Sequence, residues 1–435
     1  MNVKARFFFL FLFIIFFLQS PPYVNSSAAF PASGIYYIKA EGIVNPVMAE
    51  YLTGGIKEAG EASAEAVIIQ LDTPGGLDLS MREIIKNILS SEVPVIVYVA
   101  PAGGRAASAG VFITYAANIA AMAPGTNIGS AHPVAMGGGK IDETMAKKIE
   151  NDSVAYIRSI ASKRNRNPDW AEKAVRESVN ITPEDALKIK VIDMVAASRE
   201  DLITRLDGVR VALPGGERVI HTKGVEVVDF EMGLRFRVLN AISNPNIAYI
   251  LMMIGLIGIY FELSNPGLIL PGVVGAICLI LAFYAFQTLS INYAGLLLIG
   301  LAIVFFIVEV KVVSYGLLTI AGMISLILGS LMLFDSPAPF MRLSVWVIVP
   351  TVALMTALIL GTMYYALMLH RKKPVSGAEG LVGETGTATE DFEREGKIFI
   401  EGEYWNAVTG EPLKKGDKVK ITEVMAGLTV RVKKV

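Results

Sequence analysis

Five apolar runs in the second half of the chain limit its possible folds more than any other feature. They cover residues 247–263, 268–287, 293–310, 313–334 and 345–369. Each is long enough, or nearly so, to cross the hydrocarbon core of a bilayer. Charged or helix-breaking residues lie between them. We therefore predict an all-α transmembrane bundle over residues 246–370 with about five helices. Four spans result if the first two runs form a re-entrant pair broken at residues 265–267.

The N-terminus has the pattern of a secretory signal peptide. Lys4 and Arg6 precede an apolar run over residues 7–18, and small residues follow at 26–29. The apolar run is short for a span, which favours a cleaved signal over residues 1–29. Residues 371–373 (RKK) follow the last apolar run and predict a cytoplasmic C-terminus. An exported N-terminal domain and an odd number of spans lead to the same orientation.

Residues 30–200 alternate β-rich and helical patterns, which is typical of an α/β domain with a largely parallel sheet. Strands are expected at 35–40, 67–71, 95–99, 118–122 and 191–196, and helices at 46–59, 79–89, 106–117 and 142–163. Thr182 and Pro183 predict the start of a further helix. Residues 201–245 read as a linker or extension with a turn near 213–216.

The tail, residues 376–435, is soluble in character. Glycines separate short strand-like runs there, such as 397–400, 418–421 and 428–432. This spacing predicts a small, closed, all-β barrel.

Composition excludes several classes of function. The formal net charge is −1, so the chain has no basic field for nucleic acid. Cys278 is the only cysteine, which rules out a disulfide within one chain. The scattered acids and the few histidines form no evident ligand cluster, so we expect neither a metal nor a cofactor.

A candidate nucleophile, Ser108, lies in the small-residue segment 103–110 (GGRAASAG), after one strand-like run and before a helix. Such a serine is often only a packing position. However, a second glycine pair, Gly75 and Gly76, also follows a strand-like run. Backbone amides at such turns can approach a developing oxyanion, and a helix N-terminus favours an alkoxide. The combination predicts nucleophilic catalysis by Ser108.

A serine nucleophile needs a general base. His132 is the one histidine in the α/β region, and lysines at 140, 147 and 148 lie at or before the start of the helix expected over 142–163. A lysine can serve when burial lowers its pKa. Spacing alone does not rank these candidates.

Four motifs carry a family resemblance: residues 71–76 (LDTPGG), 106–110 (AASAG), 121–129 (AMAPGTNIG) and 182–187 (TPEDAL). Residues 34–200 resemble the ClpP-class serine peptidases, including signal peptide peptidase A. The whole chain is similar to the long-form NfeD membrane-bound peptidases in the order signal, peptidase domain, membrane bundle and barrel. The resemblance implies a ClpP/crotonase-like domain and an OB-like barrel.

The resemblance also implies the roles of residues. The nucleophile falls on Ser108, the base on Lys148, and the oxyanion amides on Gly76 and Ala109. ClpP itself uses a histidine, in a segment that resembles residues 128–133, so His132 with Glu177 is the alternative.

The implied activity is endopeptidase cleavage of apolar segments in stomatin- or prohibitin-type membrane proteins, by a homodimer or a larger homo-oligomer. The rival functions are an acyl-CoA enzyme of the crotonase kind and a non-catalytic scaffold for stomatin- or flotillin-type partners. Export away from cytoplasmic CoA argues against the acyl-CoA enzyme.

Overall fold

The computed structural model describes residues 34–134, 142–264, 269–287, 289, 291–312, 314–334, 341–370, 378–425 and 427–435. Four features from the sequence analysis lie outside these ranges: the predicted signal peptide, Lys140, the turn at 265–267 that would divide a re-entrant pair, and the basic residues 371–373. The chain divides into two compact units, Met1–Met355 and Thr356–Val435. We describe each unit by itself.

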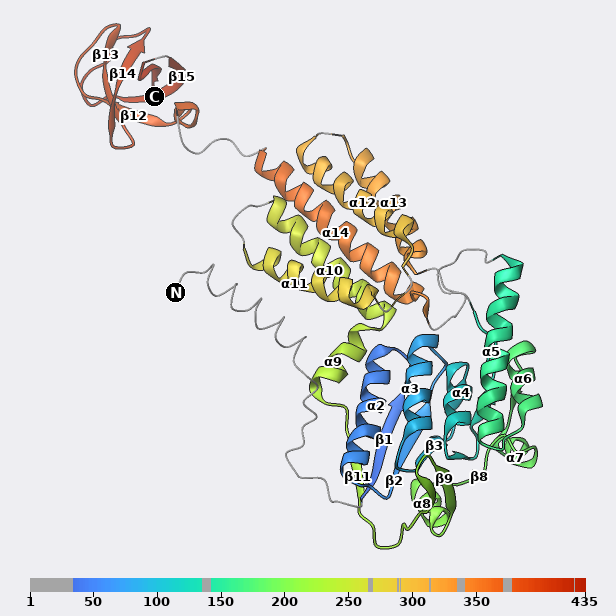
Figure 1. The fold of residues 1–435 in the computed structure, drawn as a ribbon. Helices are drawn as coiled ribbons and strands as arrows, with labels where there is room; N and C mark the ends of the chain where they lie inside the picture. Colours follow the sequence, from blue (N-terminus) through green and yellow to red (C-terminus); the bar gives the residue numbers. More distant parts are fainter. Residues whose placement is uncertain are drawn as a thin grey trace. The chain divides into compact units, whose positions relative to one another are not determined.

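A six-stranded sheet organises the N-terminal part of the first unit (Figure 1). Its order is β11-β1-β2-β3-β5-β8. The strands are β11 (Val227–Phe230), β1 (Ile35–Glu41), β2 (Ala66–Asp72), β3 (Val95–Val99), β5 (Ile119–Met122) and β8 (Met194–Val195). All neighbouring pairs are parallel, which confirms the predicted parallel α/β sheet. The edge strand β11 comes from the region that we had expected to be an extension.

Alternating side chains of the strands form two cores because both faces of the sheet are covered. Tyr36 and Ile38 of β1 pack in the core that includes α2 (Pro46–Glu61), α3 (Asp78–Ser90) and α4 (Ala109–Ala116). Their neighbours Ile35 and Tyr37 pack in the second core. That core includes residues of α8 (Arg199–Leu206) and of β9 (Arg210–Leu213). Strand β9 forms a hairpin with β10 (Gly216–Val219).

Three further helices lie between β5 and β8 in the chain. Helix α5 covers Glu143–Lys163, α6 covers Pro168–Arg176 and α7 covers Pro183–Lys188. The predicted N-cap of α7 is confirmed, because the Thr182 hydroxyl accepts a hydrogen bond from the Asp185 amide.

A small second sheet corrects one sequence prediction. It contains β4 (Arg105–Ala107), β6 (Asn127–Gly129) and β7 (Asn180–Ile181). The helix expected over 106–117 therefore begins only at Ala109. The reason is non-local: the Thr73 amide donates to the Arg105 carbonyl at 2.8 Å, and the Ala107 amide donates to the Thr73 carbonyl at 3.0 Å. These bonds hold residues 105–107 extended up to Ser108.

The apolar region is helical, as predicted. Helix α9 (Leu234–Ile242) leads to α10 (Pro245–Ser264), α11 (Leu270–Phe286), α12 (Tyr293–Lys311), α13 (Leu317–Leu333) and α14 (Val345–His370). By length and composition, Pro245–Ser264 and Val345–Thr362 can each cross a membrane, and the other three apolar helices are shorter. Helix α10 packs on α11 and α12 packs on α13. The five runs are five helices, and the number of spans stays a prediction.

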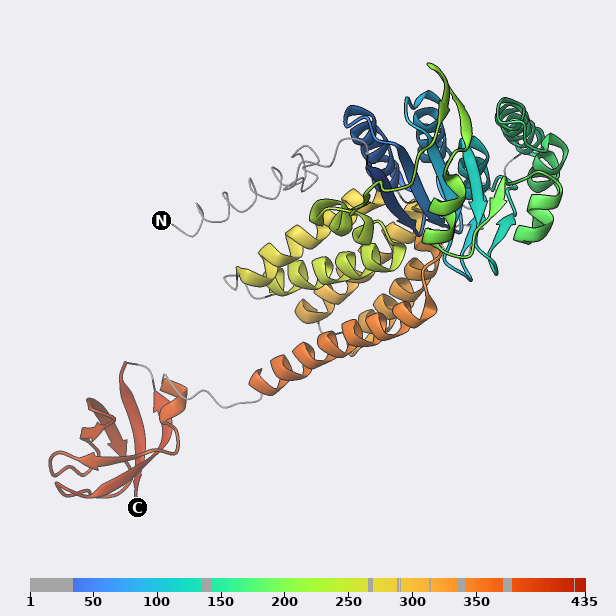
Figure 2. The same cartoon turned by 90° about the horizontal axis from the view of Figure 1, so that it is seen from below.

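The second unit contains a closed five-stranded barrel of order β12-β13-β14-β16-β15, which confirms the predicted barrel (Figure 2). The strands are β12 (Thr385–Ala388), β13 (Glu395–Ile400), β14 (Glu403–Thr409), β15 (Lys418–Met425) and β16 (Thr429–Lys434). Alternate residues such as Ile398, Val419 and Val430 fill its interior.

Candidate active site

Ser108 lies at the turn between β4 and α4 and has an unusual backbone conformation. Its φ is 53° and its ψ is −115°. Residues other than glycine rarely adopt a positive φ, and backbone strain of this kind often occurs at functional sites. The Ser108 amide donates to the Gly129 carbonyl at 3.2 Å, which helps to hold the turn. The backbone therefore places the hydroxyl at the N-terminus of α4.

The loop after β2 approaches Ser108 because it has no side chains at two positions. Gly75 has a φ of 120°, and a Cβ there would lie 2.6 Å from the Ser108 Cβ. A Cβ on Gly76 would lie 2.1 Å from the Val44 carbonyl oxygen. Both contacts are shorter than real Cβ atoms make. Glycine is therefore required at 75 for the approach to Ser108 and at 76 for the packing of the loop against Val44.

Two backbone amides beside Ser108 are free to bind a ligand. Within the described residues, neither the Gly76 amide nor the Ala109 amide donates a hydrogen bond. Val44 pairs with the flanking residues instead: its amide donates to the Gly75 carbonyl, and its carbonyl accepts from the Leu77 amide. Ala109 is the first residue of α4, so its amide has no acceptor within the helix. Two free donors beside a nucleophile suit the stabilisation of an oxyanion.

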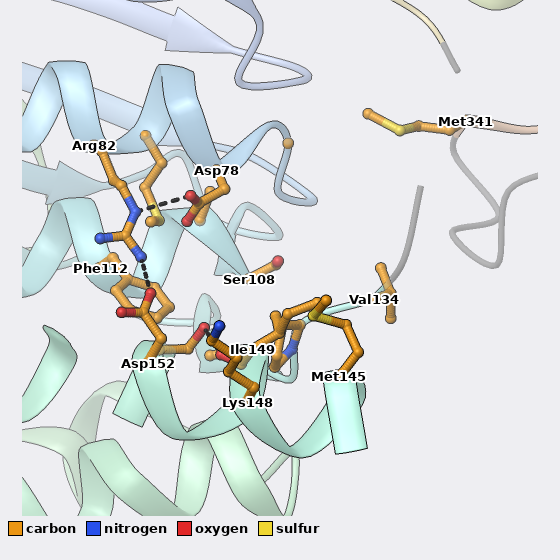
Figure 3. Close-up of a pocket in the computed structure, with 16 residues that line it drawn as sticks. Asp78, Arg82, Ser108, Phe112, Val134, Met145, Lys148, Ile149, Asp152 and Met341 are labelled. Carbon is orange, nitrogen blue, oxygen red and sulfur yellow. Dashed lines mark hydrogen bonds and ion pairs between the residues drawn. The ribbon is translucent and has the colours of Figure 1, made fainter. Parts of the chain in front are cut away.

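A cavity of about 440 Å³ brings the expected site residues together (Figure 3). Ser108, Lys148, Gly76 and Ala109 all line it. Its volume lies in the range of ligand pockets. Most of the remaining wall is apolar: Met81, Phe112, Ala131, Pro133, Val134, Met145, Ile149 and Met341. The cavity can accept an apolar group next to the serine hydroxyl.

Lys148 reaches this cavity from α5. The Asp142 side chain caps that helix by accepting from the Thr144 amide. No hydrogen bond joins Ser108 to Lys148 among the bonds of the described residues. The neighbouring Lys147 does not line the cavity and pairs with Glu143 at 2.8 Å. Of the two lysines that can be placed, Lys148 is the one that shares a cavity with Ser108.

His132 is placed differently. Its Nδ1–H donates to the Val175 carbonyl at 2.9 Å, and the residue is not part of the cavity wall. Glu177 caps the C-terminus of α6 and, within the described structure, makes no hydrogen bond to His132. The structure therefore does not assemble Ser108, His132 and Glu177 around one cavity.

Three charged residues of the cavity wall were not singled out from the sequence. Arg82 binds Asp78 at 2.8 Å and Asp152 at 2.6 Å. Partial burial tends to lower the pKa of Arg82, but the bonds to the two carboxylates outweigh this effect and raise the pKa overall. The spacing of Asp78 and Arg82 on one helix indicates a pair. The contact with Asp152 is non-local and left no sequence signal. No group of three or more potential metal ligands occurs within the described ranges.

The serine lies at a strand-to-helix turn beside two free amides, in a chain that also carries apolar helices. This is the arrangement of a membrane-bound serine peptidase with an α/β domain. Comparison with known proteins matches three domain families along the chain. They are the NfeD1b N-terminal domain at residues 34–206, the NfeD integral membrane domain at 246–365, and the NfeD-like C-terminal, partner-binding domain at 378–434. The chain belongs to the NfeD family.

Relatives match over nearly the whole length. The membrane-bound protease PH1510 of Pyrococcus horikoshii is 34% identical over 434 residues, covering 97% of this chain and 96% of the relative. The membrane protein NfeD1b of Bacillus subtilis is 25% identical, with 94% of each chain covered. A solved structure, the 1510-N membrane protease specific for a stomatin homolog from P. horikoshii, is 32% identical. The match covers 48% of this chain and 98% of the chain in that structure, with a TM-score of 0.43.

Proposed function

We propose that this chain is a membrane-anchored serine endopeptidase in which Ser108 is the nucleophile and Lys148 is the general base. The observation that supports this most directly is the shared cavity. Ser108, Lys148 and the free amides of Gly76 and Ala109 all line it. A nucleophile, a base and two oxyanion donors are the groups that acyl transfer requires.

The proposed reaction has two steps. Neutral Lys148 takes the proton of the Ser108 hydroxyl as Oγ attacks the scissile carbonyl carbon, and the Gly76 and Ala109 amides bind the resulting oxyanion. Protonated Lys148 then gives its proton to the leaving amine as the C–N bond breaks, which leaves an acyl ester on Ser108. In the second step Lys148 takes a proton from water as the water oxygen attacks the ester carbon. Protonated Lys148 then returns that proton to Ser108 Oγ as the C–O bond of the ester breaks, and the carboxylic acid product leaves.

For the substrate, we propose apolar segments of stomatin- or prohibitin-type membrane proteins. The support is the apolar cavity wall and membership of the NfeD family, within which the P. horikoshii 1510-N protease is specific for a stomatin homolog. Cleavage between apolar residues fits a wall that offers methionine, phenylalanine and isoleucine rather than many polar groups.

The proposal extends to topology and assembly. The peptidase domain lies on the extracytoplasmic side, about five helices cross the membrane, and the barrel lies in the cytoplasm. The basic residues 371–373 after α14 support this orientation. We propose a homodimer or larger homo-oligomer, which cross-linking of the full chain in detergent would detect.

A serine-directed acylating probe, such as a β-lactone, tests the nucleophile. We expect the full chain in detergent to take up one label, and mass spectrometry of the digest to map it to Ser108. A substrate peptide added in excess should slow the labelling. Labelling at another serine, or none under conditions where the protein hydrolyses peptide, would exclude Ser108 as the acylated residue.

Gly76→Ala tests the oxyanion site. The new Cβ would collide with the Val44 carbonyl and force the loop to move, which displaces the Gly76 amide from the cavity. Loss of one oxyanion donor typically costs about 10²-fold or more. We expect kcat/KM for peptide hydrolysis to fall by about that factor.

Gly54→Ala is the matched control for this change. A Cβ at Gly54 meets no atom within 4 Å, so we expect activity to be unchanged. Full activity in Gly76→Ala would show that the Gly76 amide has no part in the reaction.

A further inference from the structure

Four charged side chains line the cavity among the described residues, two from each of two helices. Asp78 and Arg82 come from α3, and Lys148 and Asp152 come from α5. Arg82 binds both aspartates: its Nε donates to Asp78 Oδ2 at 2.8 Å, and its Nη2 donates to Asp152 Oδ2 at 2.6 Å. Lys148 has neither an ion pair nor a hydrogen bond in the described part of the chain. Among the described residues of the cavity wall, the lysine is therefore the charged side chain without a partner.

Asp152 is the natural partner of Lys148 within α5. Residues four apart on a helix are neighbours on one face, and opposite charges at that spacing attract. The adjacent Lys147 shows this behaviour, because it pairs with the carboxylate of Glu143 at 2.8 Å. Asp152 instead binds Arg82 across the gap between α5 and α3 (Figure 3). Arg82 thus holds the carboxylate that Lys148 would otherwise bind.

Arg82 is itself fixed from two sides. Its guanidinium lies over the Tyr156 ring, with its carbon 4.3 Å from the ring centroid, and its Nε binds Asp78. The Arg82 side chain is 33% exposed and that of Asp152 is 66% exposed, and pairs this exposed contribute little to stability. The position of this pair in the cavity wall therefore calls for a reason other than stability.

We propose that Arg82 is a positioning residue that holds Asp152 away from Lys148, so that Lys148 can lose its proton and act as the general base. The inference rests on the proposed role of Lys148. A lysine is a base only in its neutral form, and an adjacent carboxylate would favour the charged form. The positive charge of Arg82 acts in the same direction as the removal of Asp152, because a nearby cation disfavours a second one.

Other charged groups around Lys148 are already bound or lie elsewhere. Asp78 is bound by Arg82, and Glu143 is bound by Lys147. Glu150 pairs with Arg176 at 2.6 Å. His132 is not part of the cavity wall. Loss of Arg82 would release both Asp78 and Asp152, but Asp78 lies on α3, whereas Asp152 lies one turn from Lys148 on α5. Asp152 is therefore the released carboxylate that we expect to pair with Lys148.

The test is the pH dependence of peptide hydrolysis by the full chain in detergent, measured with a quenched fluorescent peptide of apolar sequence. In Arg82→Gln, we expect the rising limb of kcat/KM to move to higher pH by about one unit. On that limb the activity falls about tenfold at a given pH, while the rate at high pH is retained. The double variant Arg82→Gln/Asp152→Asn should return the limb most of the way to its original position, because the released carboxylate is gone while the charge of Arg82 is still missing.

Arg176→Gln is the matched control. Arg176 also bridges two carboxylates, Glu150 of α5 and Glu172 of α6, and is not part of the cavity wall. We expect its pH profile to match that of the unchanged chain.

Two results would overturn the inference. One is a fall of kcat/KM in Arg82→Gln that is equal at every pH or that comes only from a higher KM. Such a result would make Arg82 a substrate-binding residue. The other is a shift that Asp152→Asn does not reverse. Lys148→Ala in the same series separates the two proposals. Activity in that variant would refute the role of Lys148, whereas its loss together with an unshifted profile in Arg82→Gln would refute only the role of Arg82.

Discussion

Ser108→Ala in the full chain is expected to reduce kcat/KM for peptide hydrolysis by about 10⁴-fold or more. Without the hydroxyl no acyl ester can form, and the remaining amides and cavity provide only binding and oxyanion stabilisation. Alanine has a Cβ like serine, so it adds no new strain at the φ of 53°. The variant should fold normally, which circular dichroism and an unchanged Tm would check.

Ser130→Ala provides the matched control. Ser130 also has a positive φ, 56°, and follows β6, but it does not line the cavity. We expect its activity to be close to that of the unchanged chain. A folded Ser108→Ala variant that still hydrolyses the peptide at more than a few per cent of the original rate would rule out the proposed nucleophile.

Lys148→Ala has the second largest expected effect, a fall in kcat/KM of about 10³-fold. The change removes the lysine that lines the cavity with Ser108 and that, in the proposed reaction, accepts the proton of the serine hydroxyl. His132→Ala should change the activity by less than about threefold, because its Nδ1 is bound to the Val175 carbonyl outside the cavity wall. The measurement is kcat/KM at several pH values for both variants.

Lys147→Ala controls for the loss of a positive charge on α5. It removes an exposed lysine paired with Glu143 and leaves the cavity wall complete, so we expect little change. Activity that survives in Lys148→Ala and disappears in His132→Ala would reverse the assignment of the base.

Hydrophobic periodicity predicted the elements that form locally. The strand patterns at 35–40, 67–71 and 95–99 correspond to β1, β2 and β3, and the five apolar runs correspond to five helices. The strand β4 was missed because residues 105–107 (RAA) are all helix-compatible. They are extended only through hydrogen bonds to Thr73 and through pairing with β6. A window of local sequence contains neither partner.

In the candidate site, too, the local sequence indicated some residues, while others depend on contacts between distant segments. Two glycine turns after strands indicated Ser108 and the loop at Gly76, since a strand exit is visible in the local pattern. The choice of Lys148 came from family resemblance, because spacing along the chain does not show which lysine of α5 faces α3. The bond from Arg82 to Asp152 joins residues 70 positions apart. Such a contact exists only after the helices have packed, so it could not be predicted.

The close approach of Gly75 to Ser108 has a consequence for when activity begins. The loop with Gly75 and Gly76 follows β2, Ser108 follows β4, and Lys148 lies on α5. None of these segments contains a reactive centre by itself. A newly made chain that has not yet folded therefore holds a serine of ordinary reactivity. In the proposed reaction, hydrolysis requires the paired sheet and the docked α5, because the three groups meet only then.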